Sequence, residues 1–93
     1  MGKHYAYLLQ CADGTIYGGY TTDLLRRTAA HNNGKGAKYT RSRRPVVLAY
    51  HECFDTKSEA LRREAALKRL SRDQKLKLIE NFNCKNSHEK NNV

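Results

Sequence analysis

At 93 residues the chain has room for one domain, because a chain of this size buries only roughly 60–65% of its extended surface on folding. It carries 18 lysines and arginines against 9 aspartates and glutamates, which gives a formal net charge of +9 and a pI near 9.8. That excess of positive charge predicts a polyanionic partner. The cations lie mostly in one loop and on helices without a strong membrane-binding pattern, so nucleic acid is favoured over an acidic membrane surface.

The three cysteines, Cys11, Cys53 and Cys84, form no C-x-x-C pair and are odd in number. They therefore exclude a disulfide framework and a zinc knuckle, and they indicate free thiols in a reducing compartment. The apolar run of residues 5–9 is too short for a signal peptide or a membrane span. We expect a cytoplasmic protein without a membrane segment.

The first third of the chain predicts a β-hairpin followed by a helix. Residues 4–11 and 15–20 are rich in Tyr, Leu and Ile and flank the turn sequence Ala12-Asp13-Gly14. A helix then begins at an N-cap, Thr22 or Asp23, and ends at Asn33-Gly34, where the glycine supplies a left-handed stop.

A basic loop and a third strand follow. Residues 34–45 hold two glycines, the only proline and five cations, which is typical of a loop. The β-branched and aromatic run 46–53 predicts a strand. We expect this strand at or near the centre of the sheet, because it is apolar on both faces at its start.

Two capping boxes, Thr56-x-x-Glu59 and Ser71-x-x-Gln74, predict a helix of about 14 residues and a shorter one that ends at Asn81. The order is therefore ββαβαα, an α/β (α+β) domain over residues 1–81 with a three-stranded antiparallel sheet flanked by helices. Residues 82–93 offer almost nothing to bury, so we expect a disordered polar tail there.

Glu64 is the most informative single residue. On a helical wheel it lies among Ala60, Leu61 and Leu67, while Arg62, Arg63 and Arg69 lie on the other side. One interpretation is an edge glutamate paired with Lys68 at i+4. The other is a ligand for Mg²⁺ or Mn²⁺, since one carboxylate with several waters can hold such an ion against a phosphate.

Arg27 and His31 are spaced i, i+4 on the first expected helix, so both side chains can meet one phosphate. Arg27 would donate a forked pair of hydrogen bonds to a phosphate oxygen, and His31 would relay a proton near neutral pH. The alternatives are a solvated arginine and a histidine that interacts with the helix C-terminal dipole.

Tyr7 and Tyr17 stand on the paired strands, where tyrosine is also common as plain sheet filler. Gly19 leaves room for a substrate backbone, or it marks a strand end. Tyr39 in the basic loop can stack on a base or join the site. The loop cations predict sequence-independent phosphate contacts, unless the loop is simply solvated; they are Lys35, Lys38, Arg41, Arg43 and Arg44.

The sequence Tyr5-Ala6-Tyr7, followed ten residues later by Tyr17-Gly18-Gly19 and then by Arg27, His31 and Glu64, resembles the GIY-YIG endonuclease family. The resemblance covers about residues 4–80 and is strongest to the small stand-alone bacterial members. These share the Asp-Gly turn, the Gly-Lys-Gly-Ala-Lys-Tyr-Thr loop and the Arg-Arg-Glu-Ala helix, here at residues 13–14, 34–40 and 62–65.

The resemblance implies phosphodiester hydrolysis with one divalent metal ion, Mg²⁺ or Mn²⁺. Tyr7 and Tyr17 would be the motif tyrosines, with Tyr17 taking the proton of the attacking water. Arg27 would contact the scissile phosphate, His31 would assist, and Glu64 would hold the metal. Many members also use an asparagine late in the domain; Asn81 and Asn83 are both candidates for that role.

Three classes of function remain open at this point. The first is a nuclease, with DNA favoured over RNA and a monomer expected. The second is a nucleic-acid-binding module of the same fold that cleaves poorly, since no separate recognition domain is present. The third is a subunit that docks by its helices, which requires an exposed apolar stripe on residues 73–82; we expect Leu76, Leu78 and Ile79 to be core instead.

The hairpin register decides whether the two motif tyrosines can share a site. A two-residue turn would pair Gln10 with Tyr17 and send Tyr7 and Tyr17 to opposite faces. A three-residue loop with a left-handed glycine pairs Leu9 with Tyr17 and Tyr7 with Gly19, so that both tyrosines face the same way. We predict the three-residue register.

Overall fold

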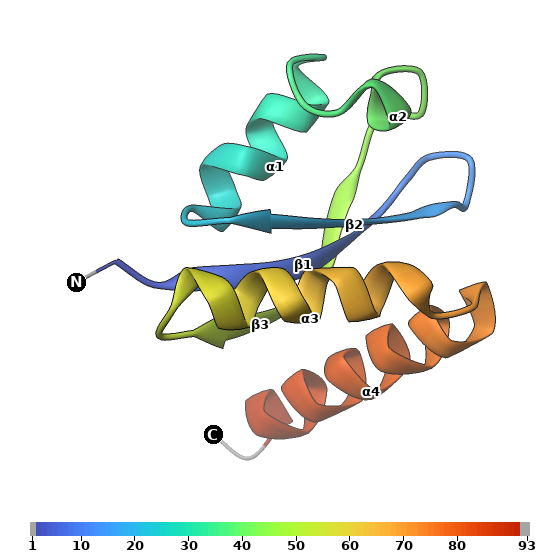
Figure 1. The fold of residues 1–93 in the computed structure, drawn as a ribbon. Helices are drawn as coiled ribbons and strands as arrows, with labels where there is room; N and C mark the ends of the chain where they lie inside the picture. Colours follow the sequence, from blue (N-terminus) through green and yellow to red (C-terminus); the bar gives the residue numbers. More distant parts are fainter. Residues whose placement is uncertain (1, 92–93) are drawn as a thin grey trace.

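The computed structural model describes the backbone of residues 2–91 and the side chains of residues 2–83 (Figure 1). The strands and helices in chain order are β1 (His4–Gln10), β2 (Ile16–Thr21), α1 (Leu24–Asn32), α2 (Lys38–Arg41), β3 (Val47–Phe54), α3 (Lys57–Arg69) and α4 (Arg72–Asn91). The predicted α+β order ββαβαα is confirmed. A four-residue helix, α2, lies within the segment that was expected to be loop throughout.

The sheet is antiparallel with the strand order β2-β1-β3, so β1 is its central strand. The prediction that the third strand is central was wrong. Four successive residues of β1, from Ala6 to Leu9, are buried, whereas Val47 on β3 is 63% exposed. An apolar run at the start of a strand therefore does not distinguish an edge strand from a central one here.

The hairpin has the predicted three-residue register. Tyr7 pairs with Gly19 and Leu9 with Tyr17, and the amide of Cys11 donates to the carbonyl of Thr15 at 2.8 Å. Gly14 has φ of 86°, the left-handed region that glycine tolerates. Because strand side chains alternate, Tyr7, Tyr17 and the Gly19 position lie on one face of the sheet.

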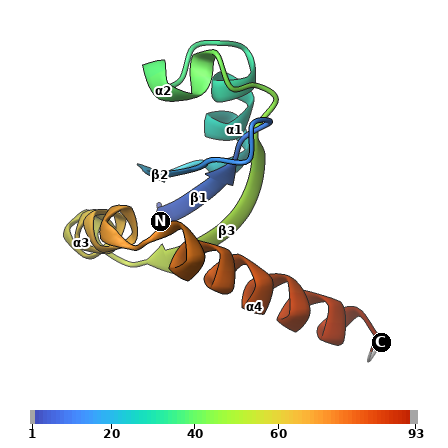
Figure 2. The same cartoon turned by 90° about the vertical axis from the view of Figure 1, so that its right-hand side faces the viewer.

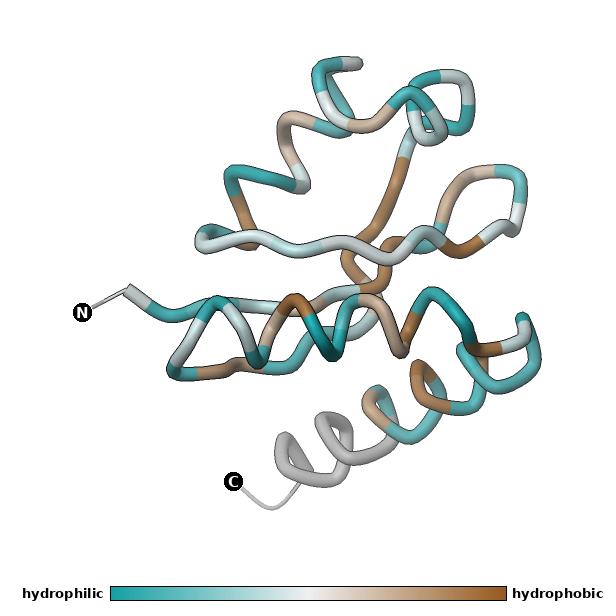
Figure 3. Tube along the Cα trace, in the orientation of Figure 1, coloured by the Kyte–Doolittle hydropathy of each residue, from teal (hydrophilic) through white to brown (hydrophobic). Residues whose placement is uncertain are grey.

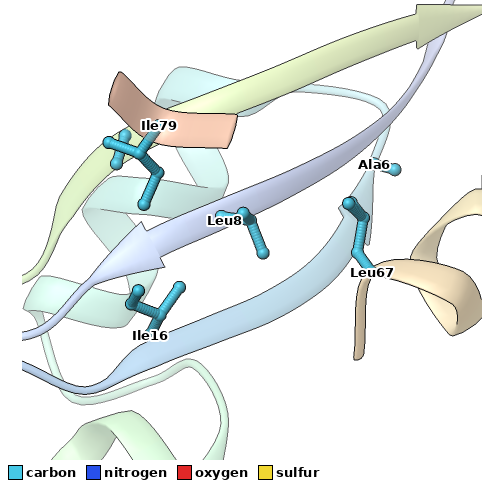
Figure 4. Close-up of a cluster of buried hydrophobic side chains, with 6 residues drawn as sticks. Ala6, Leu8, Ile16, Leu67 and Ile79 are labelled. Atoms are coloured by element: carbon cyan, nitrogen blue, oxygen red, sulfur yellow. The ribbon is translucent and has the colours of Figure 1, made fainter. Parts of the chain in front are cut away.

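Helices cover both faces of the sheet, with α1 and α2 on one side and α3 and α4 on the other (Figure 2). On the side of α3 and α4, side chains from the sheet form one core cluster with Leu67 of α3 and Ile79 of α4 (Figure 4). The sheet residues of this cluster are Ala6, Leu8, Ile16 and Ala49. Against α1 pack Tyr7, Leu9, Cys11 and Val46. The face toward α1 is the one that carries the two motif tyrosines.

The predicted helix starts are confirmed by their caps. The Asp23 side chain accepts from the amide of Arg26 at 3.1 Å at the start of α1. Thr56 accepts from the amide of Glu59 at 3.2 Å, and Ser71 accepts from the amide of Gln74 at 3.2 Å. The second capping box is complete, because the Gln74 side chain accepts from the amide of Ser71 at 2.9 Å. These bonds satisfy amide groups that a helix leaves without internal partners.

The last helix is longer than predicted, because α4 continues to Asn91 instead of ending at Asn81. Neither glycine nor proline follows Pro45, so nothing local stops the helix. Its apolar residues lie in its first turns (Figure 3), where Ile79 is buried and Leu76 and Leu78 pack against the core. These three residues are core, as expected. The division into a domain over 1–81 and a tail over 82–93 stays a prediction.

Cys11 and Cys53 are free thiols, as predicted, and the Cys84 side chain lies outside those described. Within the part of the chain that the structure describes, no helix combines the length and apolarity needed to cross a membrane.

Gly19 is a position where an added methyl group should destabilise the fold. A Cβ there would overlap the hydroxyl and ring of Tyr7, which lies across the strand pair from it. We expect Gly19→Ala to lower the free energy of unfolding by about 1–3 kcal/mol in urea denaturation. Gly2→Ala is the matched control, because a Cβ at Gly2 meets nothing within 4 Å. Equal stability of the two variants would contradict the tight Tyr7–Gly19 contact.

Candidate functional site

The site is built around three aromatic side chains from three elements. Tyr7 comes from β1, Tyr17 from β2 and His31 from the last turn of α1. The Tyr7 hydroxyl lies 3.2 Å from His31 Nε2, and the ring centroids of Tyr17 and His31 are 5.4 Å apart. The structure therefore brings Tyr7, Tyr17 and His31 together on the α1 face of the sheet.

His31 is fully buried although it stands at a helix end. Its ring turns into the site, with Nδ1 lying 2.7 Å from the hydroxyl of Thr40 on α2. Gly36 makes room for the ring, because a Cβ at Gly36 would overlap His31. Burial lowers the pKa of His31, and the nearby Arg27 charge lowers it further, so the neutral imidazole is favoured.

Tyr7 is 2% exposed. Burial raises the pKa of its hydroxyl, while Arg27 acts in the opposite direction and the charges of Tyr17 and Glu64 raise it further. Tyr7 is therefore a neutral phenol near pH 7. Tyr17 is only half-buried, so of the two motif tyrosines it is the more accessible to water.

Arg27 is half-buried beside this cluster, and its Nε is one of two buried side-chain nitrogen or oxygen atoms left without a hydrogen-bond partner among the described residues. It lines an open groove of about 300 Å³ with Thr21, Thr22, Asp23, Arg26 and Ala30. A guanidinium with an unused donor, facing a groove, has room for an anionic ligand.

Glu64 approaches from the opposite face of the sheet. Its Oε2 lies 3.3 Å from Lys68 Nζ, and Lys68 Nζ in turn lies 5.7 Å from the centroid of the Tyr17 ring. The stem of Lys68 crosses edge strand β2 at Gly18, where an added Cβ would come within 3.2 Å of Lys68 Cγ. The i, i+4 pair expected as one interpretation of Glu64 thus exists, and it places the carboxylate beside the tyrosine cluster.

Glu64 is the carboxylate that the structure places beside the tyrosine cluster. Among the residues with described side chains, no three of the His, Cys, Asp and Glu residues come together. The Glu64 side chain is 21% exposed, so it remains reachable from solvent. A single carboxylate fits the way Mg²⁺ is commonly held, with substrate phosphate oxygens and water completing the coordination.

The basic loop divides into structural and free cations. Arg43 contacts Asp13 at 3.0 Å and covers the Tyr39 ring at 4.0 Å, while Arg44 donates to the carbonyls of Arg41 and Asn32. These two arginines hold the loop together. Lys35, Lys38 and Arg41 are exposed, which keeps their predicted phosphate contacts sterically possible.

The structure also places the remaining candidates Tyr39, Gly19 and Asn81. Tyr39 stacks on Tyr17 with ring centroids 5.8 Å apart, so it joins the site, which was one of its two expected uses. Gly19 accommodates the Tyr7 ring, and the substrate approach proposed for it has no separate support. Asn81 lines a different groove, of about 280 Å³, with Arg63, Leu70, Gln74, Lys77 and Leu78.

Sequence reasoning missed three residues that shape the site: Thr40, Gly36 and Lys68. Thr40 is fully buried inside a segment whose composition reads as exposed loop, so its sequence context gave no signal. Gly36 was counted only as a loop glycine. Lys68 was considered only as a helix-surface partner for Glu64, and its path over Gly18 depends on how α3 packs against β2.

Two solved structures are similar to this chain. The solution structure of the UPF0213 protein BH0048 from Bacillus halodurans is 50% identical, with a TM-score of 0.54 over 84% of this chain and 83% of that one. The solution structure of the protein EF2693 from E. faecalis is also 50% identical, with a TM-score of 0.59 over 90% of both chains.

Sequence comparisons identify relatives and a matching family. A UPF0213 protein of Staphylococcus haemolyticus is 60% identical over 80 residues, which cover 86% of this chain and 98% of that relative. A UPF0213 protein of Halobacterium salinarum is 61% identical over 72 residues, 77% of this chain and 94% of that relative. Residues 3–77 match the GIY-YIG catalytic domain. The chain belongs to the GIY-YIG family, a nuclease superfamily.

Proposed function

We propose that this chain is a divalent-metal-dependent endonuclease that hydrolyses phosphodiester bonds in nucleic acid. The observation that supports it best is the convergence of Tyr7, Tyr17 and His31 beside Arg27, which itself lines a groove, in a chain of a nuclease superfamily. We further propose that the protein acts in the cytoplasm as a monomer, with DNA as the favoured substrate. The net charge of +9 supports a nucleic-acid substrate.

Arg27 binds the scissile phosphate in this proposal. Its unused Nε donor is held in a partly buried position, where a charged hydrogen bond to a non-bridging oxygen is stronger than in water. Charge that develops on the phosphate during hydrolysis would be stabilised by a donor that is already in place. This is why Arg27 is assigned to the reacting phosphate and the exposed loop cations to its neighbours.

The two tyrosines differ in accessibility, and we assign them different tasks. Tyr17 is half-buried and sits beside Lys68. In its phenolate form, with its own proton released to solvent, it would take the proton of the attacking water. Tyr7 is buried and in contact with His31, so it is suited to orient the phosphate by a hydrogen bond. Glu64 would hold the divalent ion, whose chemistry is to stabilise negative charge on phosphate and leaving-group oxygens.

Two grooves, each lined by a residue next to one of the motif tyrosines, suggest where the neighbouring nucleotides lie. One is the groove at Arg26 and Arg27. The other, of about 200 Å³, is lined by Thr15, Ile16, Tyr39, Arg72 and Lys75. Since Tyr39 stacks on Tyr17, this second groove adjoins the site. A phosphodiester backbone that crosses the site from one groove to the other would meet cations at both ends.

A nucleic-acid-binding module with weak cleavage is the second candidate. The ion pair between Glu64 and Lys68 supports it, because an ion would have to compete with the Lys68 ammonium for the Glu64 carboxylate. The cations needed for binding do not depend on Glu64. Substitution of Glu64 therefore separates the two functions.

Glu64→Gln should abolish metal-dependent cleavage, by at least about 100-fold, because the amide is a poor metal ligand. Affinity for an oligonucleotide should stay equal or rise slightly, since a negative charge near phosphate is removed. The measurement is cleavage of labelled single-stranded, duplex, flap and structured RNA substrates with Mg²⁺ or Mn²⁺. Glu80→Gln, at an exposed site on α4, is the charge-matched control. Cleavage by Glu64→Gln at the parent rate would remove the metal site from the proposal.

Substitution of both Arg72 and Lys75 by glutamine should weaken nucleic-acid binding. The logarithm of the binding constant should also fall less steeply with the logarithm of the salt concentration, with a slope smaller in magnitude by about 2, one for each lost phosphate contact. Arg62→Gln together with Arg69→Gln, at exposed sites on α3, removes the same charge and should change the slope less. Fluorescence anisotropy between about 50 and 200 mM salt gives both slopes. Equal slopes for the two double variants would mean that the phosphodiester backbone of the nucleic acid does not lie in the groove at Arg72.

A further inference from the structure

A continuous set of buried hydrogen bonds connects the basic segment with Tyr7. The hydroxyl of Thr40 lies 2.7 Å from His31 Nδ1, and His31 Nε2 lies 3.2 Å from the Tyr7 hydroxyl. His31 and Thr40 are both 0% exposed. With no solvent contact, the protons in this set are distributed by the protein groups alone.

The amide of Ala37 determines which ring nitrogen carries the proton. This amide points at His31 Nδ1 with an N···N distance of 3.4 Å. A backbone N–H can only donate, so a proton on Nδ1 would face it directly. Nδ1 must therefore be the acceptor nitrogen, and in a neutral imidazole the single proton is then on Nε2.

The remaining bonds agree with this assignment. The Thr40 hydroxyl has one proton and two acceptors within reach, His31 Nδ1 at 2.7 Å and the Ala37 carbonyl at 3.0 Å. Of these two acceptors the ring nitrogen is the closer by 0.3 Å, which favours donation of the hydroxyl proton to His31 Nδ1. The 2.7 Å spacing is typical of a hydroxyl donor, and 3.2 Å to Tyr7 is at the long end for a ring N–H donor.

We infer that His31 is a neutral Nε2–H donor to the Tyr7 hydroxyl, held in that tautomer by Thr40 and Ala37, and that it is a positioning residue rather than a proton relay. The positioning role of His31 in catalysis rests on the proposed function, whereas the assignment of its tautomer is independent of that function. It replaces the proton-relay role that the i, i+4 spacing of Arg27 and His31 suggested.

The consequence for Tyr7 is specific. Its oxygen accepts the His31 proton, so its own O–H is left to donate to another acceptor. A phenol that accepts one hydrogen bond becomes a stronger donor of another. The ligand that this donor fits is a non-bridging phosphate oxygen, which Arg27 would contact as well. Tyr7 and Arg27 would then hold the phosphate while Tyr17 receives the proton of water.

Nitrogen-15 NMR of histidine-labelled full-length protein tests the tautomer without any cleavage assay. Among the described side chains, the titratable groups around the His31 ring are Tyr7 from β1, Tyr17 from β2 and Arg27 from its own helix, and none of these is a carboxylate. We expect the Nε2–H tautomer at His31 and a pKa below the ordinary value of the imidazole, because burial and the Arg27 charge both lower it. The Nδ1–H tautomer, or a titration near the ordinary value of about 6.5, would overturn the inference.

Two pairs of variants extend the test to the reaction. Thr40→Ser keeps the hydroxyl and should keep the tautomer and most of the cleavage, whereas Thr40→Val should lower cleavage about tenfold and broaden the His31 tautomer signal.

His31→Gln retains an N–H donor and should cleave at least about tenfold faster than His31→Ala. Equal loss in both His31 variants, with folding verified by circular dichroism, would indicate a proton-relay role and contradict the inference. A parent protein that has the Nε2–H tautomer but cleaves no substrate would refute the proposed function and leave the inference standing.

Discussion

The register between β1 and β2 is the constraint on which the rest of the site depends. It pairs Tyr7 with Gly19 and Leu9 with Tyr17, so both tyrosines face α1. The Asp13 side chain supports that register by accepting from the amide and the hydroxyl of Thr15. A slip of one residue would move Tyr17 to the face of α3 and α4 and remove it from His31. His31 and Tyr39 both contact Tyr17 only because the hairpin is fixed in this way.

Three glycines are as important to the site as its functional side chains, because they leave space for them. Gly19 leaves space for the Tyr7 ring, Gly36 for the His31 ring and Gly18 for the stem of Lys68. Each glycine lies where two elements approach closely: within the hairpin, between α1 and the basic segment, and between β2 and α3. A side chain at any of them would push a functional residue away. The three contacts bring residues from both faces of the sheet to one edge.

Much of the fold could be predicted from local signals, because caps and turn residues act over a few positions. Asp23, Thr56 and Ser71 marked the helix starts, and Gly14 marked the turn. The strand order could not be predicted, since the apolar start of β3 is compatible with an edge as well as a central position. Charge alone also could not separate Arg43 and Arg44, which hold the loop, from the exposed Lys35. Buried Thr40 depends on tertiary contacts that no local pattern reports.

We propose that one site at the β2 edge holds the metal ion and the scissile phosphate together. Paramagnetic relaxation by Mn²⁺, measured by NMR with an uncleavable phosphorothioate oligonucleotide bound, locates the ion directly. The account predicts that the strongest broadening falls on Glu64, Lys68 and Tyr17, and that Glu64→Gln removes it. Broadening centred on other carboxylates, or broadening that survives Glu64→Gln, would contradict the account.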